Sequence, residues 1–135
     1  MKRYVNCTVA IASLLTGGAI YVLFRENTHI ARLFSSITLI EPFRIWLKET
    51  PSDVFRFYLP DFLWGLSLGC GLQAILKPTA RKNLLCGGVA FLCGVIWECL
   101  QFSHIISGTG DILDIVLYLL ACALCTFLNI KEREQ

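Results

Sequence analysis

The second half of this sequence has acidic side chains within its apolar stretches. Charged residues are rare in stretches of this kind. Glu98 lies inside one stretch and is followed by Gln101, whereas Asp114 lies inside the next stretch with Asp111 just ahead of it. Asp61 stands near the start of an earlier apolar stretch. A charged group in such a segment is costly and is expected to face other helices, so these residues are functional candidates. Their carboxylates and amide can bind a polar or cationic group or exchange protons.

Helical spacing gathers these candidates into stripes. One stripe, with steps of three or four residues, consists of Gly87, Ala90, Gly94, Glu98, Gln101 and Ile105. A second stripe consists of Asp111, Asp114, Tyr118, Cys122, Cys125 and Asn129. Because a helix turns about 100° per residue, each set shares one face. On the earlier stretch Gly65 and Gly69 share a face with Asp61, and small residues at such positions predict close contact with a neighbouring helix.

Four apolar stretches, 4–24, 59–76, 84–106 and 112–130, would carry these faces. Each is near the roughly 20 residues that a helix needs to cross a bilayer. Hydrophobic residues make up 56% of the chain and charged residues 16%, whereas a soluble domain has about 45–50% and about 25%. The sequence therefore predicts one all-α membrane domain over 1–135, a polytopic bundle of about four spans. The first stretch is long for a signal peptide and has no clear cleavage site, which favours an uncleaved helix.

The distribution of lysine and arginine predicts the orientation of the spans. One side of the membrane would carry seven basic residues: two in the N-terminal flank, three in 77–83 and two in the tail. The other side would carry five in 25–58 and none in 107–110. Both termini are therefore expected in the cytoplasm. The amphipathic spacing within 29–58 predicts an interfacial segment on the outer leaflet, and a plain connecting loop is the alternative.

This topology brings the candidate residues to a common depth. The acidic residues of the second and fourth stretches would begin inward-going helices near the outer surface. Glu98 precedes the end of its stretch by eight residues (98 to 106), which is roughly 12 Å of helix. We therefore expect four carboxylates to converge in the outer half of the bilayer, together with Gln101, His104 and Tyr118.

Four carboxylates so close together cannot all stay ionised in a low dielectric unless cations accompany them. One outcome is internal pairing with the basic residues of the outer segment, which are Arg25, Arg32, Arg44, Lys48 and Arg56. A second is recognition of a polar or cationic group of an envelope ligand. A third is acid–base chemistry or proton movement with shared protons. The sequence leaves all three open.

Several functions find little support. The net charge of +2 and the lack of a basic run argue against nucleic acid as a partner. The seven cysteines all lie in apolar stretches, which is typical of small packing residues and not of a disulfide scaffold. Cys122 and Cys125 have the spacing of half a metal or redox site, but no second pair or nearby histidine accompanies them, so no metal or cofactor is expected. An enzyme is less expected than a binding protein, since no nucleophile–base arrangement is visible.

Two segments resemble the VanZ-like family, which comprises small bacterial membrane proteins whose namesake lowers susceptibility to teicoplanin. They are WECLQ at 97–101 with SGTGDILDIVLY at 107–118, and LPDFLW at 59–64. The family pattern is a glutamate, a glutamine three residues later, a short link, and an aspartate followed by a polar residue four positions on. Glu98, Gln101, Asp114 and Tyr118 occupy those places. The resemblance covers residues 59–64 and 97–121.

The sequence departs from the family pattern in three places. The arginine often present in the link is replaced by Gly108-Thr109-Gly110, the usual asparagine is Tyr118, and the glycine that follows is Ala121. The missing arginine leaves the cation partner of the acids unidentified.

The resemblance implies a protein of the bacterial inner membrane that binds or shields an envelope component, such as a peptidoglycan precursor, a lipid or a glycopeptide antibiotic. Glu98 and Asp114 would form the core of its acidic pocket, with the other candidates around them. The alternative is an accessory subunit of a larger membrane complex, whose acids pair internally and whose outer segment docks a membrane protein partner.

Overall fold

The computed structural model describes residues 3–24, 57–76, 79–106 and 108–131, which form four α-helices and no strand. The helices are α1 (Arg3–Phe24), α4 (Leu59–Ile75), α5 (Ala80–Phe102) and α6 (Ile112–Lys131). The all-α class expected from the sequence is therefore confirmed for the described residues. Apart from its last two residues, the interfacial segment expected at 29–58 lies outside them, as do the five basic residues expected to pair with the acids.

α1, α4 and α6 begin and end within one residue of the predicted stretches. α5, which corresponds to the third stretch, is shifted toward the N-terminus. The stretch expected at 84–106 is a helix over Ala80–Phe102. It begins early because the Thr79 side chain caps it, with Oγ1 accepting a hydrogen bond from the Lys82 backbone N–H at 3.2 Å. The connection expected over 77–83 is correspondingly short, and Asn83 belongs to the helix.

The end of α5 is set by its backbone hydrogen bonds. His104 has a φ of 55°, in the left-handed region. Its N–H donates to Gln101 O at 2.9 Å, and the Ile105 N–H donates to Leu100 O at 3.0 Å. These two bonds form a Schellman motif, which terminates a helix. Ile105, expected on the stripe with Glu98, therefore lies past the helix end and is 71% exposed.

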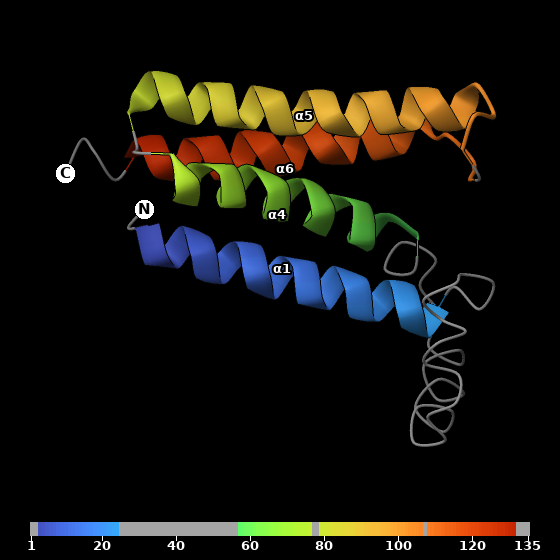
Figure 1. The fold of residues 1–135 in the computed structure, drawn as a ribbon, viewed down its shortest axis with the longest axis horizontal. Helices are drawn as coiled ribbons and strands as arrows, with labels where there is room; N and C mark the ends of the chain where they lie inside the picture. Colours follow the sequence, from blue (N-terminus) through green and yellow to red (C-terminus); the bar gives the residue numbers. More distant parts are fainter. Residues whose placement is uncertain (1–2, 25–56, 77–78, 107, 132–135) are drawn as a thin grey trace.

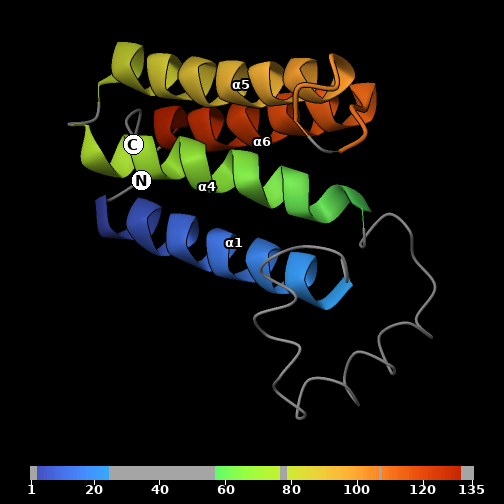
Figure 2. The same ribbon diagram turned by 45° about the vertical axis from the view of Figure 1, so that its right-hand side comes forward.

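The four helices lie side by side and alternate in direction (Figure 1). α4 packs between α1 and the pair formed by α5 and α6, an arrangement that a view turned by 45° also shows (Figure 2). The start of α1, the end of α4, the start of α5 and the end of α6 share one end of the bundle. We call this the terminal end, and the opposite end, where α4 and α6 begin, the acidic end.

Polar and small side chains occupy the interior. Among the described residues, the buried polar ones are Asn6, Ser13, Ser67, Gln73, Asn83, Glu98, Thr126 and Asn129. Apart from Tyr118, Pro60 and glycines, the buried apolar ones are alanines and cysteines. The large apolar side chains point outward, and they include Leu15, Trp64, Leu84, Leu92, Trp97 and Phe127. A water-soluble bundle has the opposite distribution, because it buries its large apolar residues. The surface of this bundle therefore suits an apolar solvent.

Two of the described helices contain stretches long and apolar enough to cross a membrane, Arg3–Tyr21 of α1 and Arg81–Phe102 of α5. α6 has a shorter apolar stretch, Ile112–Phe127, and α4 has 17 residues. Only 22% of the stretch in α1 and 33% of that in α5 is buried inside the bundle. A core helix of a soluble protein would be mostly buried, whereas both of these stretches leave most of their residues exposed.

Candidate functional site

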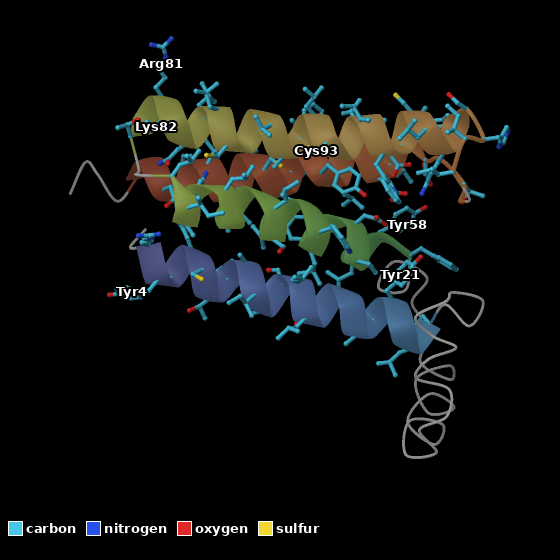
Figure 3. The ribbon with its side chains drawn as sticks, in the orientation of Figure 1. Tyr4, Tyr21, Tyr58, Arg81, Lys82 and Cys93 are labelled. Carbon is cyan, nitrogen blue, oxygen red and sulfur yellow. The ribbon has the colours of Figure 1, made fainter. Side chains whose placement is uncertain are left out.

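The acidic residues come from three helices that meet at one end of the bundle. Asp61 is in the first turn of α4, and Asp114 is in the first turn of α6. Glu98 is near the end of α5. Because α5 runs opposite to α4 and α6, these positions share the acidic end (Figure 1). The opposite end carries the exposed Arg81 and Lys82, at the start of α5 (Figure 3).

Glu98 ties the end of α5 to the start of α6. Its side chain is 1% exposed, and Oε2 accepts a hydrogen bond from the backbone N–H of Asp111 at 3.0 Å. The Asp111 carboxylate in turn caps α6, with Oδ1 accepting from the Leu113 backbone N–H at 2.9 Å. Capping by aspartate satisfies a helix N–H and places negative charge at the positive end of the helix. Asp111 thus contributes its backbone to Glu98 and its side chain to α6.

Tyr118 joins α6 to the other two helices. It is 6% exposed, and its hydroxyl donates to Asp61 Oδ1 at 2.9 Å. Its ring packs where two helices carry glycine. A Cβ added at Gly94 of α5 would lie 2.6 Å from the ring, and one added at Gly65 of α4 would lie 3.2 Å from it. The absence of side chains at these two glycines makes room for the ring.

The carboxylates are grouped around Tyr118. Asp61, Glu98 and Asp114 all lie close enough to act electrostatically on its hydroxyl. We call these four residues the acidic group. Three carboxylates and a phenol can accept hydrogen bonds from a polar or cationic group of a ligand, or share protons among themselves. The residues come from α4, α5 and α6, as the expected topology requires.

Gln101 and His104 lie at the end of α5 and just past it, where they shape the connection between α5 and α6. With its amide oriented so that both atoms have partners, Gln101 donates to Thr109 O at 3.2 Å and accepts from Trp97 Nε1 at 2.9 Å. Gly108 has a φ of 146°, and a Cβ there would lie 2.6 Å from the Gln101 amide. His104 terminates α5, and its side chain is exposed. Both residues therefore have a clear role in shaping the connection.

Of the four glycines expected at helix contacts, the other two, Gly69 and Gly87, face neighbouring helices nearer the terminal end. A Cβ added at Gly69 would lie 3.6 Å from Cys125 Sγ of α6 and 3.9 Å from Ala90 Cβ of α5. At Gly87 an added Cβ would overlap Thr126 Oγ1 of α6. These contacts hold α4, α5 and α6 close together between the acidic group and the terminal end.

A second buried polar group at the terminal end was not expected from the sequence. Asn6 and Asn129 exchange hydrogen bonds of 3.1 and 3.3 Å between α1 and α6. Asn129 Nδ2 also donates to Gln73 Oε1 of α4 at 2.6 Å, and Gln73 Nε2 donates to the Asn83 carbonyl of α5 at 3.4 Å. This amide cluster connects all four helices. The signal that could have revealed it is an amide within an otherwise apolar stretch, at positions 6 and 73.

Among the described residues no three histidine, cysteine or acidic side chains are arranged to hold a metal ion. The acidic group therefore consists of carboxylates and a hydroxyl in a setting of helix-to-helix hydrogen bonds. Comparison of the chain with protein-family models, with curated proteins and with solved structures gave no match.

Proposed function

We propose that this protein is a VanZ-like protein of the bacterial cytoplasmic membrane with four spans and both termini in the cytoplasm. In this proposal the acidic group faces the outer side and binds or shields a polar or cationic group of an envelope component. The candidates are a peptidoglycan precursor, a lipid, and a glycopeptide antibiotic of the teicoplanin type. The observation that carries the proposal is the grouping of Asp61, Glu98 and Asp114 around Tyr118 at one end of the bundle.

The inverted distribution of side chains supports the membrane location. The bundle buries asparagine, glutamine and glutamate and exposes leucine, tryptophan and phenylalanine. Only an apolar solvent favours this arrangement, because there the polar groups must find their partners inside the protein.

Packing supports four spans, although only two of the described helices contain long apolar stretches. α4 and α6 pack directly alongside α1 and α5, so if the outer pair crosses the bilayer, the helices packed against them cross it too. The 17 residues of α4 extend about 26 Å, slightly less than the roughly 30 Å hydrocarbon core. A small local thinning of the bilayer accommodates such a difference.

The charges at the two ends support the orientation. Arg3 begins α1, and Arg81 and Lys82 begin α5, so the described basic residues gather at the terminal end (Figure 3). Positive residues flanking spans favour the cytoplasm. The acidic end is then the outer end, where an envelope ligand is accessible.

Ligand binding is best tested on the two acids that form the core of the proposed pocket. We would express the chain in a teicoplanin-sensitive Gram-positive host and measure the minimum inhibitory concentration. The wild type is expected to raise it, and Glu98→Gln and Asp114→Asn are expected to return it to the empty-vector value. Each variant replaces a carboxyl group with an amide while nearly preserving side-chain size.

The control variant is Lys82→Gln, which changes one charge at the terminal end and should retain the wild-type phenotype. Immunoblots of membrane fractions must show equal amounts of all variants, so that a loss of insertion is recognised. If Glu98→Gln and Asp114→Asn protect the cells as well as the wild type does, the acidic group is not the binding site.

A second candidate function is that of a non-catalytic accessory subunit in a larger membrane complex. The observation that favours it is that several acidic oxygens already accept hydrogen bonds from the chain itself: Glu98 from Asp111 N–H, Asp61 from Tyr118, and Asp111 from Leu113 N–H. Purification in a mild detergent from native membranes separates the two. A stoichiometric membrane protein partner favours the accessory subunit, and a monomer without one favours the binding protein.

A further inference from the structure

Two cysteine thiols from different helices meet in the interior of the bundle. Cys70 of α4 and Cys125 of α6 are 1% and 0% exposed, and their sulfur atoms are 2.9 Å apart. Both are free thiols, as are the other five cysteines. The pair that the sequence spacing singled out, Cys122 and Cys125, is therefore not the pair in contact. Cys125 instead contacts a residue 55 positions away in the chain.

The local packing holds these two thiols together. The backbone of α4 approaches α6 at Gly69, where an added Cβ would lie 3.7 Å from Cys125 Cβ. The Cys125 thiol donates to Gln73 Oε1 at 3.0 Å, which leaves its sulfur free to accept from Cys70. Since a disulfide needs an S–S distance of about 2.05 Å, the sulfurs must approach by about 0.9 Å.

We propose that Cys70 and Cys125 form a reversible disulfide that locks α4 to α6 under oxidising conditions. The oxidant class is a small neutral peroxide, such as hydrogen peroxide, which can enter an apolar interior. One thiol sulfur attacks the peroxide, so that the O–O bond breaks, an S–O bond forms and one water leaves. The second sulfur then displaces the oxygen, so that the S–S bond forms and a second water leaves. Two thiols and one peroxide thus give one disulfide and two waters.

The lock would act on the helices that carry the acidic group. Cys125 lies seven residues after Tyr118 (118 to 125) on α6, which is about two helical turns. α4 contributes Cys70 to the lock and Asp61 to the acidic group. A covalent bond between these helices limits how far Asp61 and Tyr118 can separate. The inference rests on the thiol geometry alone and does not depend on the proposed function.

The test counts thiols in the full chain with the three exposed cysteines, Cys7, Cys93 and Cys99, replaced by alanine. This leaves the four buried thiols. The reconstituted protein is treated with hydrogen peroxide, denatured in SDS and labelled with polyethylene glycol maleimide, which adds a mass per free thiol on a gel. Oxidation is expected to reduce the adducts from four to two, and dithiothreitol is expected to restore four.

Single substitutions identify the partners. With Cys70→Ala or Cys125→Ala, the three remaining thiols should all stay labelled after peroxide. With Cys86→Ala or Cys122→Ala as matched buried controls, the adducts should fall from three to one. Four adducts in the oxidised parent, or a loss that dithiothreitol does not reverse, overturns the proposal.

A readout on the parent protein covers the case in which a variant does not fold. Mass spectrometry of the digested, oxidised four-cysteine protein should find the peptide containing Cys70 linked to the peptide containing Cys125. A linkage of either residue to Cys86 or Cys122 instead contradicts the proposed pair.

Discussion

Tyr118 is the residue on which the acidic end depends most directly. Its hydroxyl reaches Asp61 on α4, and its ring fills the space beside glycines of both α4 and α5. The hydroxyl and the ring therefore make separable contributions, one polar and one steric. The sequence placed Tyr118 on a stripe with Asp114, but it could not say which neighbour the phenol would contact.

Tyr118→Phe removes the hydroxyl and keeps the ring, so it isolates the bond to Asp61. We expect it to lower the free energy of unfolding by about 0.6–1.7 kcal/mol, the range of interhelical hydrogen bonds in membrane proteins. The measurement is an unfolding titration in mixed dodecyl maltoside and SDS micelles. In a double-mutant cycle, adding Asp61→Ala, which removes the acceptor, to Tyr118→Phe should cost less than Asp61→Ala does alone. Strictly additive effects would mean that the two side chains do not interact.

The helices approach one another closely only where a small residue allows it. Gly94 faces the Tyr118 ring, whereas no atom lies within 4 Å of a Cβ added at Gly88, six residues earlier on the same helix. The two glycines are thus equivalent in residue type and in secondary structure. They differ only in what lies next to them.

This difference makes a matched pair of substitutions in α5. Gly94→Ala would place a methyl group 2.6 Å from the Tyr118 ring, and overpacking of this kind costs about 1–3 kcal/mol. Gly88→Ala meets open space and should leave stability unchanged or raise it by up to about 1 kcal/mol through helix propensity. The same detergent unfolding titration compares the two. Equal effects would show that α5 and α6 do not pack at Gly94.

Helix boundaries show where reasoning from sequence succeeded and where it failed. The boundaries of α4 and α6 follow from the edges of their apolar stretches. The start of α5 was missed because Arg81 and Lys82 lie in its first turn, and hydropathy alone assigned these charges to a connection. Its end was missed because His104 occupies the left-handed position that glycine usually takes.

For the candidate site, the sequence correctly predicted that Asp61, Glu98 and Asp114 lie near one another. It did not predict the structural roles of Asp111 and His104. Periodicity and alternating helix direction gathered Asp61, Glu98 and Asp114. The capping role of Asp111 and the outward position of His104 depend on local backbone geometry, which periodicity does not contain. The amide cluster was missed because an isolated amide does not reveal its partner on another helix.

At the scale of the whole molecule, the arrangement of apolar surface and end charges predicts a topology that can be measured. We expect Thr109→Cys, at the acidic end, to react with a membrane-impermeant maleimide in intact cells. Arg81→Cys, at the terminal end, should react only after the membrane is permeabilised. Both positions are exposed in the bundle, and the unaltered chain measures labelling of the native cysteines. The reverse pattern, or labelling of both positions from one side, contradicts the orientation.

The reciprocal bonds between Asn6 and Asn129 join the first helix to the last across 123 positions of the chain. Because synthesis runs from the N-terminus, Asn6 is made well before Asn129. Until α6 arrives, Asn6 lacks its partner, and Gln73 lacks the amide that donates to it. A buried amide without its hydrogen-bond partner is unfavourable, so α1 and α4 lack this stabilisation until α6 is in place. A chain that stops short of residue 129 therefore leaves side-chain amides of α1 and α4 without these hydrogen bonds.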